Sequence, residues 1–199
     1  ELPHMLPSVE MWRNIVSNLG ILNNDNIIIY DNSDLISSCR CWYTFRYFGH
    51  DSSLVSVLDG GLKKWIQEGK PTVNYNTTIN ESIYKAIENK DMVKSKTEID
   101  ENIRLNNFKV VDARSYDRFK GIVPELRPNV RSGSIQGSSC LPFTKIINEN
   151  NNTFKNISEL NKIFKEVMNT QDNNIVFSCG SGVTASVLAL AYSLINNKY

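Results

Sequence analysis

The chain has 199 residues, of which 41% are hydrophobic, so it can bury one large core or two small ones. Its 22 basic and 21 acidic residues nearly cancel to a formal net charge of +1, and neither sign forms a long block. This balance gives no electrostatic basis for binding nucleic acid or an anionic membrane. We therefore expect a small-molecule or protein partner, with no nucleic-acid and no membrane partner.

The first part of the chain alternates predicted helices and strands. Its apolar patterns and glycine stops predict, in order, a helix at 8–19, a strand at 27–30, a helix at 39–48, a strand at 54–58 and a helix at 62–68. This alternation is typical of a parallel sheet flanked by helices. Residues 73–90 carry no periodic apolar pattern and predict a linker. We therefore divide the chain into a domain at 1–72, a linker at 73–90 and a second domain at 91–199.

The second domain is predicted to have the same architecture. Its expected elements are a polar helix at 94–102, a strand at 109–113, a helical turn at 116–119, a short strand at 139–141, a helix capped by Ser158, a strand at 175–178 and an apolar helix at 185–195. A long irregular loop with several glycines and prolines spans 120–137. The fold class is therefore α/β, with two tandem domains that each form a parallel sheet flanked by helices.

The loop 179–184, with the sequence CGSGVT, joins the last predicted strand to the last predicted helix. Its two glycines allow the backbone to curl so that N–H groups turn inward. Those groups and the start of the helix favour negative charge beside the Cys179 sulfur, which predicts a thiolate with a lowered pKa. Cys179 is therefore the candidate nucleophile.

Two other interpretations of Cys179 compete with a nucleophile. A lone cysteine in an intracellular protein is usually a small buried apolar residue, although packing alone does not explain the glycine-rich loop. Cysteine phosphatases have a similar loop that closes on an arginine six positions after the nucleophile, where this chain has Ala185. The missing cation favours sulfur chemistry over phosphate chemistry.

The chain has four cysteines, and their spacing matches no metal site, so no metal is expected. Their low density favours a reducing compartment over a disulfide scaffold. Cys39 and Cys41 share a predicted helix two positions apart, so they point away from each other. We interpret both as structural.

An internal repeat relates the two halves of the chain. Residues 25–31 match residues 173–179, and a loop and a helix follow each segment. Asp31 stands in the first copy where Cys179 stands in the second, so we infer that one domain is catalytic and the other is not. Chance similarity of two α/β units is the alternative. The repeat also predicts missing elements before Glu1 and after Tyr199, so we expect a longer protein.

Besides the loop 179–184, both halves of the chain carry short distinctive motifs. They are Pro3 to Pro7, Gly49-His50, Leu58 to Leu62 with Trp65, Asp112-Ala113-Arg114, Arg118-Phe119, Arg127-Pro128, Arg131-Ser132-Gly133 and Leu141-Pro142-Phe143. Through these motifs the chain resembles the rhodanese superfamily, and within it the 3-mercaptopyruvate sulfurtransferases, whose active-site loop is similar to 179–184. The chain departs from the family's pattern at Gly133 to Gly137 and at Cys140. The resemblance implies an inactive first rhodanese domain and a catalytic second one.

The resemblance implies a sulfurtransferase that carries sulfur as a persulfide on Cys179. The thiolate would attack the sulfur of 3-mercaptopyruvate and release pyruvate. A thiol such as thioredoxin, or cyanide, would then accept the sulfur, and no cofactor is implied. The expected compartment is the cytoplasm, with the mitochondrion left open because a targeting segment would precede Glu1.

The resemblance also assigns roles to residues around the nucleophile. Arg118 and Arg127 match substrate-binding arginines, whose planar forks suit the carboxylate and the neighbouring oxo group of 3-mercaptopyruvate. Ser181 and His4 match residues proposed to move a proton, together with an aspartate expected upstream of Glu1. The remaining expected substrate-binding residues are Gly180, Gly182, Val183 and Thr184.

Two alternative functions remain open from the sequence. Thiosulfate sulfurtransferases carry basic residues in the loop, whereas Gly180 and Ser181 are uncharged, which favours 3-mercaptopyruvate as the donor. A non-catalytic rhodanese-like scaffold or persulfide carrier is the alternative of another class. The intact Cys179 loop argues against a scaffold more strongly than against a carrier.

Overall fold

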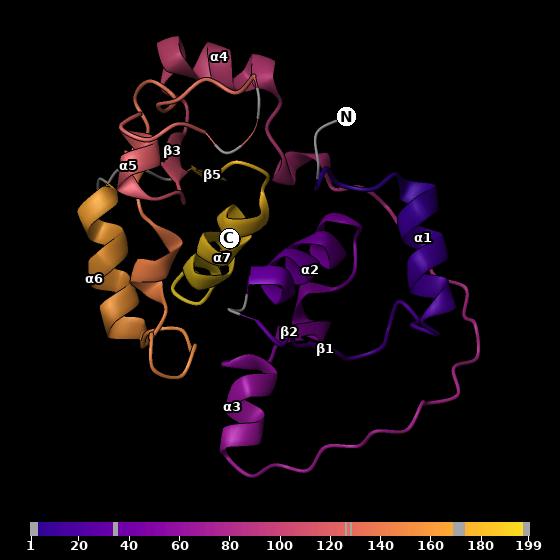
Figure 1. Cartoon of the computed structure of the whole chain (residues 1–199). Helices are drawn as coiled ribbons and strands as arrows, with labels where there is room; N and C mark the ends of the chain where they lie inside the picture. The colour runs from indigo at the N-terminus through magenta and orange to yellow at the C-terminus, as the bar shows by residue number, and fades with distance from the viewer. Residues whose placement is uncertain (1–3, 34–35, 126, 128, 169–173, 197–199) are drawn as a thin grey trace. The chain divides into compact units, whose positions relative to one another are not determined.

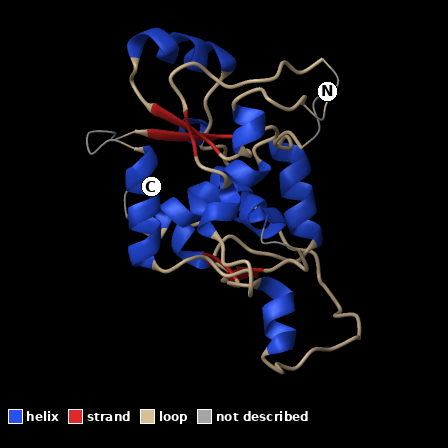
Figure 2. Cartoon of the chain, turned by 60° about the vertical axis from the view of Figure 1, so that its left-hand side comes forward, coloured by secondary structure: helices blue, strands red, loops and turns tan. Residues whose placement is uncertain are grey.

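The computed structural model describes residues 4–33, 36–125, 127, 129–168 and 174–196. They group into two compact units, one spanning His4–Val93 and the other beginning at Lys94 (Figure 1). All strand pairs in the two sheets are parallel, which confirms the predicted α/β class (Figure 2). The domain limits at 72 and 91 stay predictions. Pro3, Pro128 and Asn173, which belong to predicted motifs or to the repeat, lie outside the described residues.

The His4–Val93 unit has a two-stranded sheet. Its elements are α1 (Val9–Asn18), β1 (Ile27–Ile29), α2 (Ile36–Tyr47), the 3-10 helix η1 (Ser52–Leu54), β2 (Val55–Val57), α3 (Gly61–Gln67) and the 3-10 helix η2 (Lys90–Met92). The register of the two strands pairs Ile27 with Val55. An aromatic core holds the helices together, and within it the Trp12 ring stacks on Phe48 with centroids 5.4 Å apart.

Part of the predicted linker is hydrogen-bonded to this unit. The Ser82 N–H donates to the Ser17 carbonyl at 3.0 Å, and the Ile87 N–H donates to the Phe48 carbonyl at 3.1 Å. Between them Tyr84 is only 1% exposed. This segment therefore contributes a fully buried aromatic ring to the core, although its sequence carries no helix or strand pattern.

The unit that begins at Lys94 has a three-stranded parallel sheet of order β4-β3-β5. Its elements are α4 (Lys96–Leu105), β3 (Lys109–Asp112), α5 (Tyr116–Phe119), β4 (Ser139–Cys140), the 3-10 helix η3 (Phe143–Ile146), α6 (Ile157–Val167), β5 (Ile175–Ser178) and α7 (Val183–Ser193). Asp112 at the end of β3 pairs with both Cys140 and Ser178. The loops that follow β3, β4 and β5 therefore all start at the same end of the sheet, where these parallel strands end.

The helix α7 is the buried element of this unit. Every residue from Ala185 to Tyr192 is buried, and the helix packs against β5 and η3. The helix α4 lies on the other side of β3 from α7 (Figure 1). The rings of Phe164, Phe177 and Tyr192 pack together with centroids 5.3 to 6.1 Å apart, which joins α6, β5 and α7. This packing holds α7 against β5, the strand that leads into the Cys179 loop.

The predicted cap of α6 was wrong. Asn156, not Ser158, caps the helix: its side chain accepts the Glu159 N–H at 3.0 Å, and the Glu159 carboxylate accepts the Asn156 N–H at 3.3 Å. This reciprocal capping box satisfies two N–H groups at once, so the helix begins at Ile157. Ser158 falls inside the first turn.

Candidate active site

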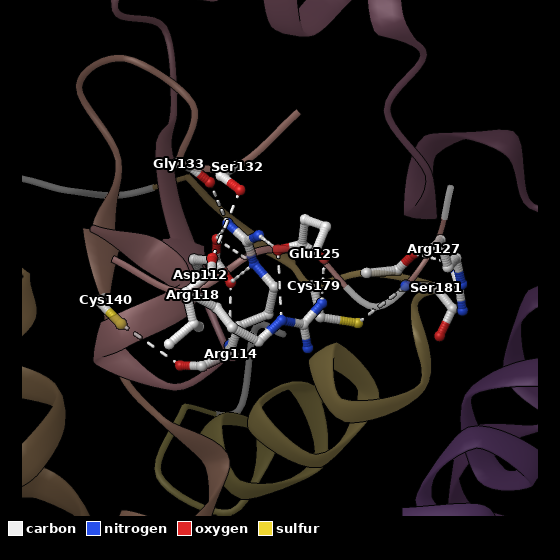
Figure 3. Close-up of polar contacts among 12 residues, drawn as sticks. Asp112, Arg114, Arg118, Glu125, Arg127, Ser132, Gly133, Cys140, Cys179 and Ser181 are labelled. Carbon is white, nitrogen blue, oxygen red and sulfur yellow. Dashed lines mark hydrogen bonds and ion pairs between the residues drawn. The ribbon is translucent and has the colours of Figure 1, made fainter. Parts of the chain in front are cut away.

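Cys179 follows the last residue of β5 and lies four residues before the start of α7. Its sulfur accepts the Gly182 N–H at 3.0 Å and the Ser181 N–H at 3.4 Å (Figure 3). Gly182 caps α7 with φ of 75°, a left-handed conformation that suits glycine. The predicted loop of inward-facing N–H groups is therefore present around the sulfur.

The loop stabilises a thiolate at Cys179. Burial opposes ionisation, but hydrogen bonds from the Thr184 hydroxyl and from the N–H groups of Ser181, Ala185 and Gly182 outweigh it, so the pKa of Cys179 is lowered. The other three cysteines behave in the opposite way. Burial raises the pKa of Cys39, of Cys41 to about 11 and of Cys140 to about 11. Cys179 is therefore the cysteine of this chain that is set up to react.

Both predicted substrate-binding arginines lie against the residue that follows Cys179. The Arg127 Nη1 donates to the Gly180 carbonyl at 2.5 Å (Figure 3). Arg118 also lies near this residue, since a Cβ added to Gly180 would lie 3.2 Å from Arg118 Nη2. The structure thus brings two guanidinium groups to the thiolate loop, where they can bind an anionic ligand.

A network of ion pairs supports Arg118. Arg118 contacts the Glu125 carboxylate, which also contacts Arg114, and Arg114 in turn binds Asp112 at the end of β3 (Figure 3). These pairs are partly or fully shielded, with the Glu125 side chain only 4% exposed. Bonds from Arg118 and Arg114 lower the pKa of Glu125, although burial opposes them, so it is ionised at neutral pH. We call these four residues the arginine network.

No pattern in the sequence predicts a role for Glu125. The residue lies between Pro124 and Leu126 in the long irregular loop, and no spacing or motif distinguishes it there. Asp112 and Arg114 belong to a motif of the rhodanese resemblance, which implies no role for either residue. A hydrogen bond between Arg114 and Glu125, eleven residues apart, depends on how the loop folds back, which a local pattern does not reveal.

The remaining predicted site residues are placed as follows. The N–H groups of Ser181 and Gly182 and the hydroxyl of Thr184 donate hydrogen bonds to the Cys179 sulfur. Val183 is the first residue of α7. His4 belongs to the other unit, where its carbonyl accepts a bond from Arg40 Nη2 at 3.1 Å. The roles of His4 and Ser181 in proton transfer therefore stay predictions.

Asp31, the counterpart of Cys179 in the repeat, performs a structural role. It follows β1, and its carboxylate accepts the Ser33 N–H at 3.2 Å and the Ser38 N–H at 2.9 Å. These bonds satisfy N–H groups around the start of α2. At the position that matches Cys179, a carboxylate therefore accepts N–H groups near a helix start and takes the place of a nucleophile.

Metal-binding clusters and membrane-spanning helices are absent from the described ranges. No three histidine, cysteine or acidic side chains among the described residues gather in a way that could hold a metal ion. In the same part of the chain, no helix has the length and apolar character needed to cross a membrane.

Comparison with known proteins places these features in one family. The family model described as Rhodanese-like domain matches residues 3–68 and 95–198. Thiosulfate/3-mercaptopyruvate sulfurtransferase 2 of Arabidopsis thaliana is 37% identical over 95% of this chain and 60% of its own length, and mouse 3-mercaptopyruvate sulfurtransferase is 36% identical over 94% and 63%. The chain therefore spans about three fifths of these relatives.

A solved structure agrees with the sequence matches. The crystal structure of SseA from Escherichia coli, described as a 3-mercaptopyruvate sulfotransferase with the rhodanese fold, superposes with a TM-score of 0.84 at 33% identity. The match covers 98% of this chain and 71% of that chain. The match therefore includes both of the parallel α/β units of this chain.

Proposed function

Since the chain belongs to the rhodanese family, we propose that it moves sulfur from 3-mercaptopyruvate to a thiol acceptor through a persulfide on Cys179. The observation that carries the proposal is the lowered pKa of Cys179 in a loop that two arginines contact. The names of the Arabidopsis, mouse and Escherichia coli proteins support the same donor.

The proposed reaction uses the thiolate as the attacking group. The Cys179 sulfur forms a bond to the sulfur of 3-mercaptopyruvate, and the carbon–sulfur bond of the donor breaks with its electron pair left on carbon. The resulting enolate takes the proton that the donor thiol carried, which yields pyruvate and an anionic persulfide. An acceptor thiol then attacks the outer sulfur, becomes a persulfide and returns Cys179 as the thiolate.

The loop amides and the arginines would have different roles in the reaction. The N–H groups of Ser181 and Gly182 stabilise the negative charge on the Cys179 sulfur. Arg118 and Arg127 would bind the donor's carboxylate and oxo group, which places the donor sulfur beside the thiolate. Ser181 and His4 are proposed to pass the proton, as family resemblance implies.

The glycine at position 180 supports 3-mercaptopyruvate over thiosulfate. A Cβ at this position would lie 3.2 Å from Arg118 Nη2, which is a tight contact. A basic residue here would meet the guanidinium and repel it. Thiosulfate remains the alternative donor, because the Arabidopsis relative carries both activities in its name.

The acceptor and the compartment are part of the proposal as well. A small thiol protein such as thioredoxin is the proposed acceptor, because it supplies the second thiolate that the persulfide requires. We place the protein in the cytoplasm, where reducing conditions keep free thiols such as Cys179 available. The relative from Arabidopsis that is named mitochondrial makes that organelle the alternative.

Steady-state release of pyruvate tests the proposed reaction. The full-length protein should release pyruvate from 3-mercaptopyruvate with a thiol acceptor, and Cys179→Ser should abolish the release. Equal or faster turnover with thiosulfate would contradict the choice of donor. A single stoichiometric burst of persulfide, with no turnover in the presence of excess thiol, would identify a carrier instead of an enzyme.

A further inference from the structure

We propose that Glu125 is a positioning residue, which holds the Arg118 guanidinium against the Cys179 loop in the orientation that binds the donor's carboxylate. The inference rests on the proposed function, because the donor is the anion that Arg118 would bind. It assigns a role to a residue that no sequence motif identified.

Glu125 holds Arg118 at two points. Arg118 Nη2 donates to Glu125 Oε2 at 2.5 Å, and Arg118 Nε donates to Glu125 Oε1 at 3.3 Å. A carboxylate that binds one edge of a guanidinium fixes the plane of the group as well as its position. Within the described residues, Arg118 Nη1 bonds no acceptor, so it remains available to a ligand carboxylate.

Glu125 is itself connected to the sheet through Arg114. Its Oε1 accepts Arg114 Nη1 at 2.6 Å, and Arg114 binds both oxygens of Asp112, the last residue of β3. Arg114 Nη2 also donates to the Gly133 carbonyl at 2.8 Å, which anchors the C-terminal part of the loop 120–137. The central strand β3 therefore orients the Arg118 guanidinium through Arg114 and the buried Glu125 carboxylate (Figure 3).

A purely electrostatic role for Glu125 predicts the opposite behaviour. The arginine network contains two acidic and two basic side chains, so Glu125 cancels positive charge beside the site. If cancelling charge were its only effect, Glu125→Gln would strengthen the attraction of an anion to Arg118. If Glu125 positions Arg118, the same variant weakens that attraction, because a free arginine side chain samples many orientations.

The test compares two alkylating agents that differ by one carboxylate. The Cys179 sulfur displaces bromide from 3-bromopyruvate, which carries a carboxylate, and from bromoacetone, which does not. The ratio of the two rate constants on the full-length protein reports recognition of the carboxylate. Cys179→Ser provides the background from the other cysteines, and Glu166→Gln removes a charge from an exposed position of α6 as a matched control.

We expect the 3-bromopyruvate to bromoacetone ratio to fall about tenfold in Glu125→Gln, since a hydrogen bond to a charged group is worth about that factor. Glu125→Asp should give an intermediate ratio, because it keeps the charge but shortens the reach. Glu166→Gln should match the wild type. In turnover assays Glu125→Gln should raise KM for 3-mercaptopyruvate more than it lowers kcat.

An unchanged or raised ratio in a folded Glu125→Gln variant would overturn the proposal. Thermal unfolding shows whether each variant is folded; if Glu125→Gln is not, a wild-type ratio in Glu125→Asp overturns the proposal and an intermediate ratio supports it. A ratio near one in the wild type would also overturn it, since Arg118 would then not recognise the carboxylate. Alkylation requires no sulfur transfer, so this result is independent of whether pyruvate is released.

Discussion

Replacing Thr184 by valine tests how the loop produces a reactive thiolate. Burial of Cys179 raises its pKa, and the Thr184 hydroxyl is the leading contribution that lowers it, ahead of the N–H groups of Ser181, Ala185 and Gly182. Valine keeps the branched shape of threonine and removes the hydrogen-bond donor. The variant therefore isolates one hydrogen bond to the sulfur.

The expected size of the effect follows from the energy of such a bond. A hydrogen bond to a charged group is worth about 1.5–3 kcal/mol, and one pKa unit corresponds to about 1.4 kcal/mol. Thr184→Val should therefore raise the pKa of Cys179 by roughly one to two units. Below the pKa, each unit lowers the thiolate fraction about tenfold, while the more basic sulfur reacts roughly threefold faster, for a net loss of roughly threefold.

The assay is the pH dependence of Cys179 alkylation by iodoacetamide, a neutral reagent that the arginines do not recognise. Ser186→Ala is the matched control, because the Ser186 hydroxyl donates to the Gly182 carbonyl at 2.8 Å in the same loop without bonding the sulfur. We expect the control to retain the wild-type midpoint. A wild-type midpoint in Thr184→Val would refute the assigned role of the hydroxyl, and equal shifts in both variants would show that loop packing, not the bond, sets the pKa.

Three further predictions concern the arginines, acid stability and the core. Arg127→Ala should raise KM for 3-mercaptopyruvate with a smaller effect on kcat, because it removes a group that contacts the loop at Gly180; a change confined to kcat in steady-state assays would contradict this. Bonds from Arg118 lower the folded-state pKa of Glu125, so its ion pairs contribute stability above the unfolded pKa of about 4.3 that is lost as pH falls through the folded value. The stability difference between wild type and Glu125→Gln in denaturant titrations should therefore shrink in acid, and a difference independent of pH would argue against the ion pairs. Tyr84→Ala should destabilise the protein by roughly 3–5 kcal/mol in the same titrations, whereas its neighbour Ile83, which is 84% exposed, should tolerate alanine, and similar losses would contradict the assigned burial.

The parts of the site that sequence could predict are local. The strand at Ile175–Ser178 was predicted from a β-branched and aromatic run, and the loop after it from two glycines within four residues. Both signals lie within a few residues of the structure that they determine. The thiolate loop could therefore be recognised before its surroundings were known.

The parts that sequence could not predict depend on distant segments or on competing local choices. Glu125 meets Arg114 and Arg118 because an irregular loop folds back on the end of β3, and no periodic pattern encodes that path. At α6 both Asn156 and Ser158 are good capping residues. Glu159, three residues after Asn156, decides between them because it completes the capping box.

The two units show that a strand-to-helix loop does not make a catalytic site by itself. After β1 the carboxylate of Asp31 accepts the Ser33 and Ser38 N–H groups, much as the Cys179 sulfur accepts two N–H groups after β5. Both loops direct N–H groups at the side chain that follows the strand, but a carboxylate is a weak nucleophile for sulfur and a thiolate is a strong one. The second loop also has Arg118 and Arg127 beside it, and Asp112, Arg114 and Glu125 connect Arg118 to the sheet. Activity would therefore require the nucleophile and the anchored cations together, so placing a cysteine at position 31 should not by itself create a sulfurtransferase site.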